Sequence, residues 1–516
     1  MKLKVKHLGI DSAGKPVVLL NRVDCEELGI KSTARVKVKF KNRSKTCIVN
    51  VTSNRKILKV GWIGFTEEVR KSLKTKEGCL VEVEVAKYPS SLHFIRERLR
   101  GRRLGYKEFY EIVKDTVEGN LTESEIAAFV TSLHYFKLTL EEAANLTLAM
   151  VNTGKILKLK KKIIADKHSI GGTLGDKTSI LLVPIIASLG ITIPKTSSRA
   201  ITSPAGTADK AECLMPVSLE VEEMERVVRK TNGCLVWGGS LGLAPADDIF
   251  IKVEHPLEID PLLFPSIMSK KKAVGATHVV IDIPTGRGTK VKTIGDANYL
   301  AKDFIQLGRI LGMKINCAIT NGEFPIGYCI GPALAAREAL EIIMRKKLVK
   351  DQVDKVLDIA GILLSLIGKK NGRELAKKAW LSGKAERKLR QIIEEQGGNP
   401  KIKPEDIPIG KFNLEYRAKN SGLVIWMDNW KLAQIARLAG APKDKGAGIV
   451  LRKKPGDKVE KGEIVFTVYA EKERKLERVV KYLETEIPVG IAEKAEMLIQ
   501  VIKERVVHRK SFILER

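Results

Sequence analysis

The sequence predicts a multidomain protein of the α/β and α+β classes. We expect a small β-barrel-like N-terminal domain, a helical lobe, a large α/β lobe and a C-terminal α+β portion. Three observations predict this organisation. The chain begins with short segments of alternating apolar and polar residues, continues with helix-capping motifs, and then alternates short apolar runs with helical patterns. A length of 516 residues leaves room for several domains.

The first 86 residues form the predicted β-rich domain. Its expected strands cover residues 17–20, 34–40, 46–51 and 80–85. Alternation of this kind is typical of half-buried strands in a small barrel or sandwich. Since nothing in the segment looks catalytic, we expect a docking or oligomerisation module.

Residues 87–160 form the predicted helical lobe. Thr122-x-x-Glu125 and Thr139-x-x-Glu142 are capping boxes, and each precedes an apolar periodic run. The second run stops at Gly154. Two short antiparallel helices are therefore expected here.

Residues 161–410 form the predicted α/β core, and residues 411–516 form the C-terminal α+β portion. Expected strands of the core cover residues 191–193, 279–283 and 315–319. Residues 333–396 have a largely helical pattern. Strands separated by helices are typical of βαβ units.

The charge balance is strongly basic, with 91 Lys+Arg against 61 Asp+Glu and a net charge of +30. Such an excess fits a nucleic acid, an anionic small substrate, or a surface rich in lysine and glutamate. Aromatic residues make up only 5% of the chain, and the basic residues are spread through all segments. This pattern argues against a nucleic-acid groove and leaves open an anionic substrate or a surface rich in lysine and glutamate.

Seven cysteines are scattered without a Cys-x-x-Cys pair, and the seven histidines form no ligand pattern. We therefore expect buried thiols in a reducing compartment, and neither disulfides nor a metal site. No apolar run is long enough to span a bilayer, and the N-terminus has no apolar signal-peptide region. The expected location is cytoplasmic, without a membrane partner.

One glycine-rich stretch, residues 166–179, has the composition of an anion site. It follows a run, residues 162–165, that resembles the end of a strand, and it precedes an apolar run, residues 180–189, that resembles a buried helix. Glycines between a strand and a helix let backbone N–H groups approach an anion, and the helix N-terminus adds positive potential. Hydroxyl and ammonium donors are supplied by Lys167, Ser169, Thr178 and Ser179. The alternative is a glycine-rich turn with solvated polar residues.

Three further stretches carry candidate site residues. Residues 195–210 are dense in hydroxyls directly after a strand, where α/β proteins bind ligands. Residues 241–271 offer carboxylates, His255 and a Ser-x-x-x-Lys spacing, and residues 282–290 form another strand-to-glycine loop ending in Lys290. Together they predict one oxyanion-rich cleft.

The motifs in these stretches resemble the thymidine/pyrimidine-nucleoside phosphorylase family. They are Asp166-Lys167-His168-Ser169-x-Gly171-Gly172 with Asp176 and Thr178-Ser179, Ser197-x-Arg199, Gly206-Thr207-x-Asp209-Lys210-x-Glu212, and Leu243-Ala244-Pro245-Ala246-Asp247. The resemblance covers about residues 90–510, and the N-terminal extension and residues 198–203 are similar to the archaeal branch. It implies phosphorolysis of AMP, with CMP and UMP as further candidate substrates, to free base and ribose 1,5-bisphosphate. Inorganic phosphate is then a co-substrate, and no cofactor is implied.

The resemblance also implies roles for individual residues. Asp260 is the implied proton donor to the departing base, which requires that burial or a neighbouring carboxylate such as Glu258 raise its pKa. The alternative is that Asp260 merely caps the helix opening at Pro261. The implied phosphate ligands are Lys167, Ser169, Ser179 and Ser197. The implied contacts to the substrate are Gly172, Ser198, Arg199, Ala200, Ile201, Thr202, Ser203, Thr207, Ser266 and Lys290. The basic residue that binds the 5′-phosphate stays open.

The chain departs from the pyrimidine enzymes at two places. Where those enzymes use an arginine to recognise the base, this chain has Glu254-His255, and a His-Thr-Gly run is replaced by Ser203-Pro204-Ala205. Two alternatives stay open: a thymidine or uridine phosphorylase, and a nucleic-acid-binding protein on an inactive scaffold. By resemblance, residues 247–272 join the helical lobe, the lobes close over the substrate, and the protein is a homodimer or larger homo-oligomer.

Overall fold

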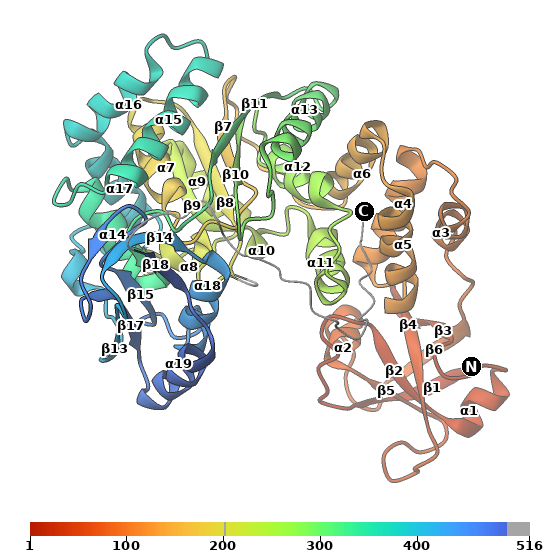
Figure 1. The fold of residues 1–516 in the computed structure, drawn as a ribbon. Coiled ribbons are helices and arrows are strands. Elements are labelled where there is room, and N and C mark those ends of the chain that lie inside the picture. Colours follow the sequence, from red (N-terminus) through yellow and green to blue (C-terminus); the bar gives the residue numbers. More distant parts are fainter. Residues whose placement is uncertain (201–202, 493–516) are drawn as a thin grey trace, which may run out of the picture.

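The computed structural model describes residues 1–200 and 203–492. The chain forms a barrel, a helical lobe, an α/β lobe and a C-terminal portion, and the helical lobe lies between the barrel and the α/β lobe (Figure 1). The predicted fold class is therefore confirmed. Ile201, Thr202 and the segment 493–516 lie outside the described residues.

Residues 1–86 form a closed six-stranded barrel with the strand order β1-β5-β2-β4-β3-β6. Its strands are β1 Lys2–His7, β2 Val17–Asn21, β3 Arg35–Phe40, β4 Arg43–Thr52, β5 Trp62–Phe65 and β6 Leu80–Val85. Two short helices, α1 (Arg22–Glu27) and α2 (Glu67–Leu73), accompany them. Alternate residues such as Val36 and Val38 are fully buried, so the alternation in the sequence predicted the inward face correctly.

The helical lobe is built from α3 Ser91–Leu99, α4 Tyr106–Glu118, α5 Glu123–Phe136 and α6 Leu140–Asn152. Both predicted capping boxes are present. Glu142 accepts the Thr139 N–H at 3.1 Å and also binds the buried Arg98 at 2.8 Å, so the capping residue also ties α6 to α3. Later in the chain, α11 (Pro245–Leu257) and α12 (Leu263–Ala273) pack on this lobe; Phe250 contacts Phe129 with ring centroids 5.9 Å apart.

Parallel strands form the sheet of the α/β lobe. They are β7 Ala165–Ser169, β8 Ile193–Ser197, β9 Gly233–Trp237, β10 His278–Thr285 and β11 Lys314–Asn321. The strands pair in two groups, with the orders β11-β10-β7 and β8-β9. A parallel bridge between Ile164 and Thr192 links the two groups. Because parallel strands end at one edge, the loops after β7, β8 and β10 meet there.

Two strand boundaries differ from the prediction. We expected one strand to end at Ala165, but β7 begins there and contains Asp166 and Lys167; the strand expected at residues 191–193 is β8, Ile193–Ser197. Both errors have one cause. Polar side chains lie inside these strands because ion pairs from distant segments compensate them, and local hydrophobicity does not reveal such partners.

Helices cover both faces of this sheet. One core, which contains Val280 and Leu235, packs against α7 Thr178–Ser188, α14 Pro332–Ile343, α15 Lys350–Leu366, α16 Gly372–Leu381 and α17 Lys384–Glu395. The other core, which contains Val279 and Ile281, packs against α9 Val221–Thr231, α12 and α13 Ile294–Ile310. Short helices α8 Thr207–Ala211 and α10 Gly238–Leu241 follow β8 and β9. The predicted buried helix is α7, and the predicted helical stretch is α14–α17.

The C-terminal portion consists of two small sheets with the orders β12-β15-β17-β13 and β16-β14-β18, together with α18 and α19. Its elements are β12 Cys329–Ile330, η1 Pro404–Asp406, β13 Phe412–Arg417, β14 Gly422–Met427, α18 Asn429–Leu438, β15 Gly448–Leu451, β16 Lys458–Val459, β17 Ile464–Ala470, α19 Glu473–Thr485 and β18 Val489–Ala492. Leu174 of the glycine-rich loop belongs to the hydrophobic core of this portion, so the C-terminal portion packs against the loop. In the described part of the chain, no helix combines the length and the apolar character that crossing a bilayer requires.

Candidate functional site

The glycine-rich loop lies between β7 and α7, at the edge of the sheet where the strands end. Gly172 has φ +100°, and a Cβ added to it would lie 2.7 Å from Thr289 Cα and 3.0 Å from Lys290 N. Only glycine tolerates both that φ and that approach. The loop after β7 is therefore packed directly on the loop after β10.

Lysines and aspartates form a buried network beneath this loop. Lys167 Nζ lies 3.1 Å from Asp282 Oδ2, and Lys355 Nζ lies 3.1 Å from the same oxygen and 3.2 Å from Asp176 Oδ2. Lys210 Nζ donates to the main-chain oxygen of Asp176 at 2.6 Å. Although burial opposes ionisation, Lys355 and Lys167 hold the pKa of Asp176 well below its ordinary value. The glycine-rich loop is thus anchored by charge to β10 and α15.

A second part of the network surrounds Asp166, which is fully buried. Lys271 Nζ lies 2.6 Å and Lys195 Nζ 3.8 Å from its carboxylate oxygens. Burial, and then the charge of Lys271, lowers the pKa of Lys195 well below its ordinary value. Burial likewise lowers the pKa of His168. The amines outnumber the carboxylates here, so an entering anion would stabilise their charged forms.

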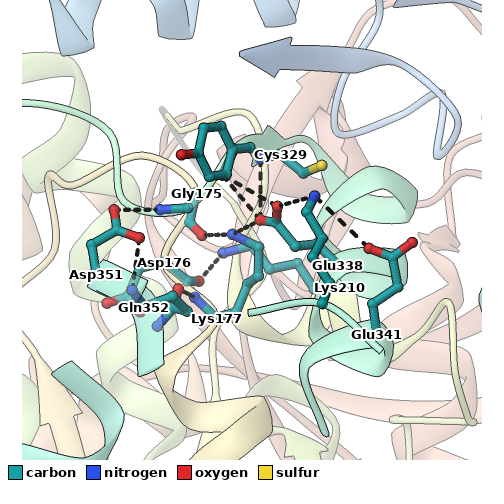
Figure 2. Close-up of polar contacts among 12 residues, drawn as sticks. Gly175, Asp176, Lys177, Lys210, Cys329, Glu338, Glu341, Asp351 and Gln352 are labelled. Carbon is teal, nitrogen blue, oxygen red and sulfur yellow. Dashed lines mark hydrogen bonds and ion pairs between the residues drawn. The ribbon is translucent and has the colours of Figure 1, made fainter. Parts of the chain in front are cut away.

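Figure 2 shows how the end of the glycine-rich loop is fixed, with the Lys177 amine directed toward Glu338. Lys177 Nζ lies 2.8 Å from Glu338 Oε2, and both side chains are fully buried. Lys177 N–H donates to Gln352 Oε1 at 2.9 Å. These contacts fix the first turn of α7, in which the predicted phosphate ligand Ser179 is 7% exposed.

The loop after β8 is closed by Asp209 of α8. Asp209 Oδ2 accepts the N–H groups of Ala200 at 2.7 Å and Gly206 at 2.9 Å. A Cβ at Gly206 would lie 2.5 Å from Ser198 O, so this turn also requires glycine. Ser198, Ser203 and Thr207 lie in or beside this loop, and Ser197 ends β8.

Arg199, a candidate for binding a substrate phosphate, is paired within the protein. It donates to both carboxylate oxygens of Glu212, at 2.8 and 2.5 Å, and its guanidinium lies 4.8 Å from the centroid of the Trp237 ring. These hydrogen bonds lower the pKa of Glu212 to about 2. Two of the five guanidinium N–H donors are thus engaged by Glu212.

Asp260 and Lys290 connect the helical side of the molecule with the loop after β10. Asp260 lies in the turn between α11 and α12, and its Oδ2 is 3.0 Å from Lys290 Nζ. The carboxylate forms no cap hydrogen bond, since α12 begins at Leu263 with Leu262 as its N-cap. The alternative that Asp260 merely caps a helix at Pro261 is therefore wrong. Ser266 lies one turn further along, in the first part of α12.

A buried carboxyl, Glu254, lies near the end of α11, close in the chain to this turn. Glu258 is exposed, and Asp260 has a side chain that is 46% exposed. Burial, and then the neighbouring Asp260, raises the pKa of Glu254 to about 7. The sequence showed Glu254 as one of the carboxylates of residues 241–271 and as a departure from the pyrimidine enzymes, and it could not choose among those carboxylates. Its depth of burial comes from the packing of α11, which the sequence did not show.

The sequence also missed two lysines of the network. Lys355 lies on α15, far along the chain from Asp176 and Asp282, and no local signal marks it. Lys271 is the middle residue of a run of three lysines on α12, where it is 1% exposed. Among the residues that the structure describes, no group of three or more His, Cys, Asp or Glu side chains is placed to bind a metal ion.

Three family models match successive parts of this chain. Residues 161–386 match the glycosyl transferase family a/b domain, residues 92–154 its helical bundle domain, and residues 423–490 the C-terminal domain of pyrimidine nucleoside phosphorylase. Among solved structures, an anthranilate phosphoribosyltransferase from Thermus thermophilus is 18% identical, with a TM-score of 0.49, and covers 58% of this chain and 98% of its own.

Full-length relatives are much more similar in sequence. The AMP phosphorylase of Thermofilum pendens is 48% identical over 518 residues, covering 100% of both chains. That of Pyrococcus furiosus is 44% identical over 508 residues, covering 98% of this chain and 100% of the relative. That of Methanococcoides burtonii is 44% identical over 486 residues, covering 93% and 95%.

Proposed function

The chain belongs to the family of AMP phosphorylases, and on that premise we propose that it catalyses the phosphorolysis of AMP by inorganic phosphate. The resemblance found in the sequence is thereby confirmed. One observation carries the proposal: the glycine-rich loop, whose Asp176 is bound by the lysine network, packs at Gly172 on Thr289 and Lys290, and Lys290 is paired with Asp260. This arrangement supports the proposal that an anion binds near a candidate acid.

The glycine-rich loop is the proposed site of the attacking phosphate. Lys167, Ser169, Ser179 and Ser197 are its proposed ligands, with the backbone of Gly172. The surrounding amines support this proposal. Burial lowers the pKa of Lys210 to about 8, so a phosphate dianion nearby would favour its charged form.

The nucleotide is proposed to lie between this loop and the α11–α12 turn. Phosphate oxygens would attack C1′ of the ribose while Asp260 protonates the departing base, which gives free base and ribose 1,5-bisphosphate. Lys290, Ser266, Thr207 and the segment 198–203 are the proposed nucleotide contacts. Inorganic phosphate is a co-substrate in this reaction, and the proposal includes no cofactor and no nucleic-acid partner.

The oligomeric state and the cellular location complete the proposal. We propose a homodimer or larger homo-oligomer, which light scattering tests directly. We also propose a cytoplasmic location, which is supported by seven cysteines that form no disulfide within the described residues.

The test is product analysis with matched substrates. Purified protein is incubated with phosphate and either AMP, CMP, UMP, adenosine, uridine or thymidine, and released base is measured. Base release from AMP but not from adenosine supports the proposal. Release only from uridine or thymidine would replace it by a pyrimidine-nucleoside phosphorylase, the alternative favoured by the match at residues 423–490. Salt-dependent polynucleotide binding without phosphorolysis would support the inactive-scaffold alternative.

A further inference from the structure

The first turn of α7, which carries the proposed phosphate ligand Ser179, cannot form an ordinary capping box from its own residues. The N-cap residue is Lys177, and a lysine side chain has only donors. The third helical residue is Ile180, whose side chain has no acceptor for the N-cap N–H. The cap of this helix therefore depends on partners from elsewhere in the chain.

Gln352 of α15 is such a partner. Its Oε1 accepts the N–H of Lys177 at 2.9 Å (Figure 2). Its Nε2 donates to the Thr178 hydroxyl at 3.2 Å. Gln352 is fully buried and lies 175 positions further along the chain than Lys177. It thus takes the place of the capping-box glutamine and bonds both residues that precede Ser179.

The same part of α15 also holds the glycine-rich loop. Thr178 N–H donates to Asp176 Oδ1 at 2.7 Å, and Asp176 Oδ2 lies 3.2 Å from the amine of Lys355, one turn after Gln352. Lys355 Nζ also lies 3.1 Å from Asp282 Oδ2 of β10. The first turns of α15 therefore fix the start of α7, the loop before it and β10 relative to one another.

The two sides of the proposed phosphate site both depend on α15. Ser179 is 7% exposed and follows directly on the two residues that Gln352 bonds. Lys167, on the other side, lies 3.1 Å from Asp282 Oδ2, the oxygen that Lys355 also binds. A phosphate held between two groups is bound well only when their separation is kept. Gln352 sets the Ser179 side of that separation.

We propose that Gln352 is a positioning residue for the phosphate site, which fixes the first turn of α7 so that Ser179 and Lys167 bind the same phosphate. This inference rests on the proposed function. Gln352 acts through Lys177 and Thr178, and the phosphate itself is bound by the ligands proposed above.

A second buried glutamine provides a matched control. Gln396 is 4% exposed; its Oε1 accepts the N–H of Leu235 at 2.9 Å, and its Nε2 donates to the main-chain oxygen of Pro216 at 2.7 Å. It makes one accepted and one donated hydrogen bond to distant segments, as Gln352 does. Loss of either side chain leaves buried polar groups unpaired, so the two substitutions should cost similar stability.

The test compares Gln352→Met with Gln396→Met in the full-length protein. Methionine has a similar length but makes neither hydrogen bond. We expect Gln352→Met to raise the dissociation constant for inorganic phosphate, measured by calorimetry, by about tenfold. The half-saturating phosphate concentration in phosphorolysis should rise by the same factor, with the KM for AMP unchanged. Gln396→Met should keep the wild-type values of all three quantities.

Thr178→Val keeps the test decisive if Gln352→Met does not fold, which urea unfolding shows. Valine has the shape of threonine and removes only the hydroxyl to which Nε2 donates, so phosphate binding should weaken in the same direction. Combined with Gln352→Met, this change should add little, because both variants break the same contact.

An unchanged dissociation constant for phosphate in folded Gln352→Met overturns the inference, as does an equal increase in Gln396→Met. If Gln352→Met does not fold, an unchanged constant in Thr178→Val overturns it. In each case, base release from AMP by the wild type leaves the proposed function standing. If the wild type releases no base from AMP, the proposed function fails and the inference fails with it.

Discussion

The buried lysine network and the α11–α12 turn are the two halves of the candidate site, and they are built differently. Around the glycine-rich loop, Asp166 and Asp282 are fully buried and each is approached by two lysines. At the turn, the single pair of Asp260 with Lys290 is about half exposed. A buried network is fixed before any ligand arrives, whereas an exposed pair can exchange partners at little cost. We infer that the phosphate half is pre-organised and that the nucleotide half is completed by the substrate.

The largest expected effect is at Asp260. Asp260→Asn removes the proposed proton donor without changing side-chain size, so we expect kcat to fall by about 10²–10⁴-fold with AMP binding retained. Steady-state kinetics and calorimetric AMP binding measure the two quantities. Wild-type turnover in this variant would remove the acid role of Asp260.

The next effect contrasts the two kinds of ion pair. Lys271→Met removes the ammonium group 2.6 Å from buried Asp166 and leaves it Lys195 at 3.8 Å and the Lys167 N–H at 2.7 Å, and should lower the free energy of unfolding by about 3–5 kcal/mol. Lys290→Met breaks an exposed pair and should lower it by less than about 1 kcal/mol. Equilibrium urea unfolding of both variants measures the difference. Equal losses in the free energy of unfolding would show that the ion pairs of the two halves do not differ in their contribution to stability.

Lys167→Met tests the phosphate half directly. Asp282 keeps Lys355 at 3.1 Å, so the fold retains one partner for this buried carboxylate. We expect the half-saturating phosphate concentration to rise by about 10–100-fold, as for loss of one charged hydrogen bond. Kinetics at varied phosphate and fixed AMP measure the change, and an increase confined to the KM for AMP contradicts the assignment.

Glu254 also predicts a pH-dependent stability. Its pKa is raised from 4.5 to about 7 in the folded protein, so the folded state favours the protonated carboxyl. The stability that this preference contributes is fully present below the pKa of the unfolded state and is lost as the pH rises through the pKa of the folded state. Relative to that of the wild type, the free energy of unfolding of Glu254→Gln should therefore rise by about 1–3 kcal/mol between pH 4.5 and pH 7.5. Urea unfolding across this range checks the sign, with Glu258→Gln as a control that should show no trend.

The smallest effect distinguishes two neighbouring glycines. Both Gly171 (φ +92°) and Gly172 (φ +100°) have conformations that disfavour alanine, but only at Gly172 would a Cβ meet another segment. Gly171→Ala measures conformational strain alone, about 1–2 kcal/mol. Gly172→Ala should in addition displace Thr289 and Lys290 and raise the KM for AMP. Equal KM values in the two variants contradict the contact between the loops.

The sequence by itself determined the order of the domains, the barrel, the capped helices and the loops that carry the candidate site. Alternation, capping boxes and glycine motifs are local signals, because they report how a segment satisfies its own backbone and which face it buries. The tertiary structure alone decided that Lys355 and Lys271 compensate Asp282 and Asp166, that β7 and β8 extend into polar sequence, and that Glu254 rather than Glu258 is the buried carboxyl beside Asp260. Partners far apart in the chain set these charges and this burial, and no local pattern records them.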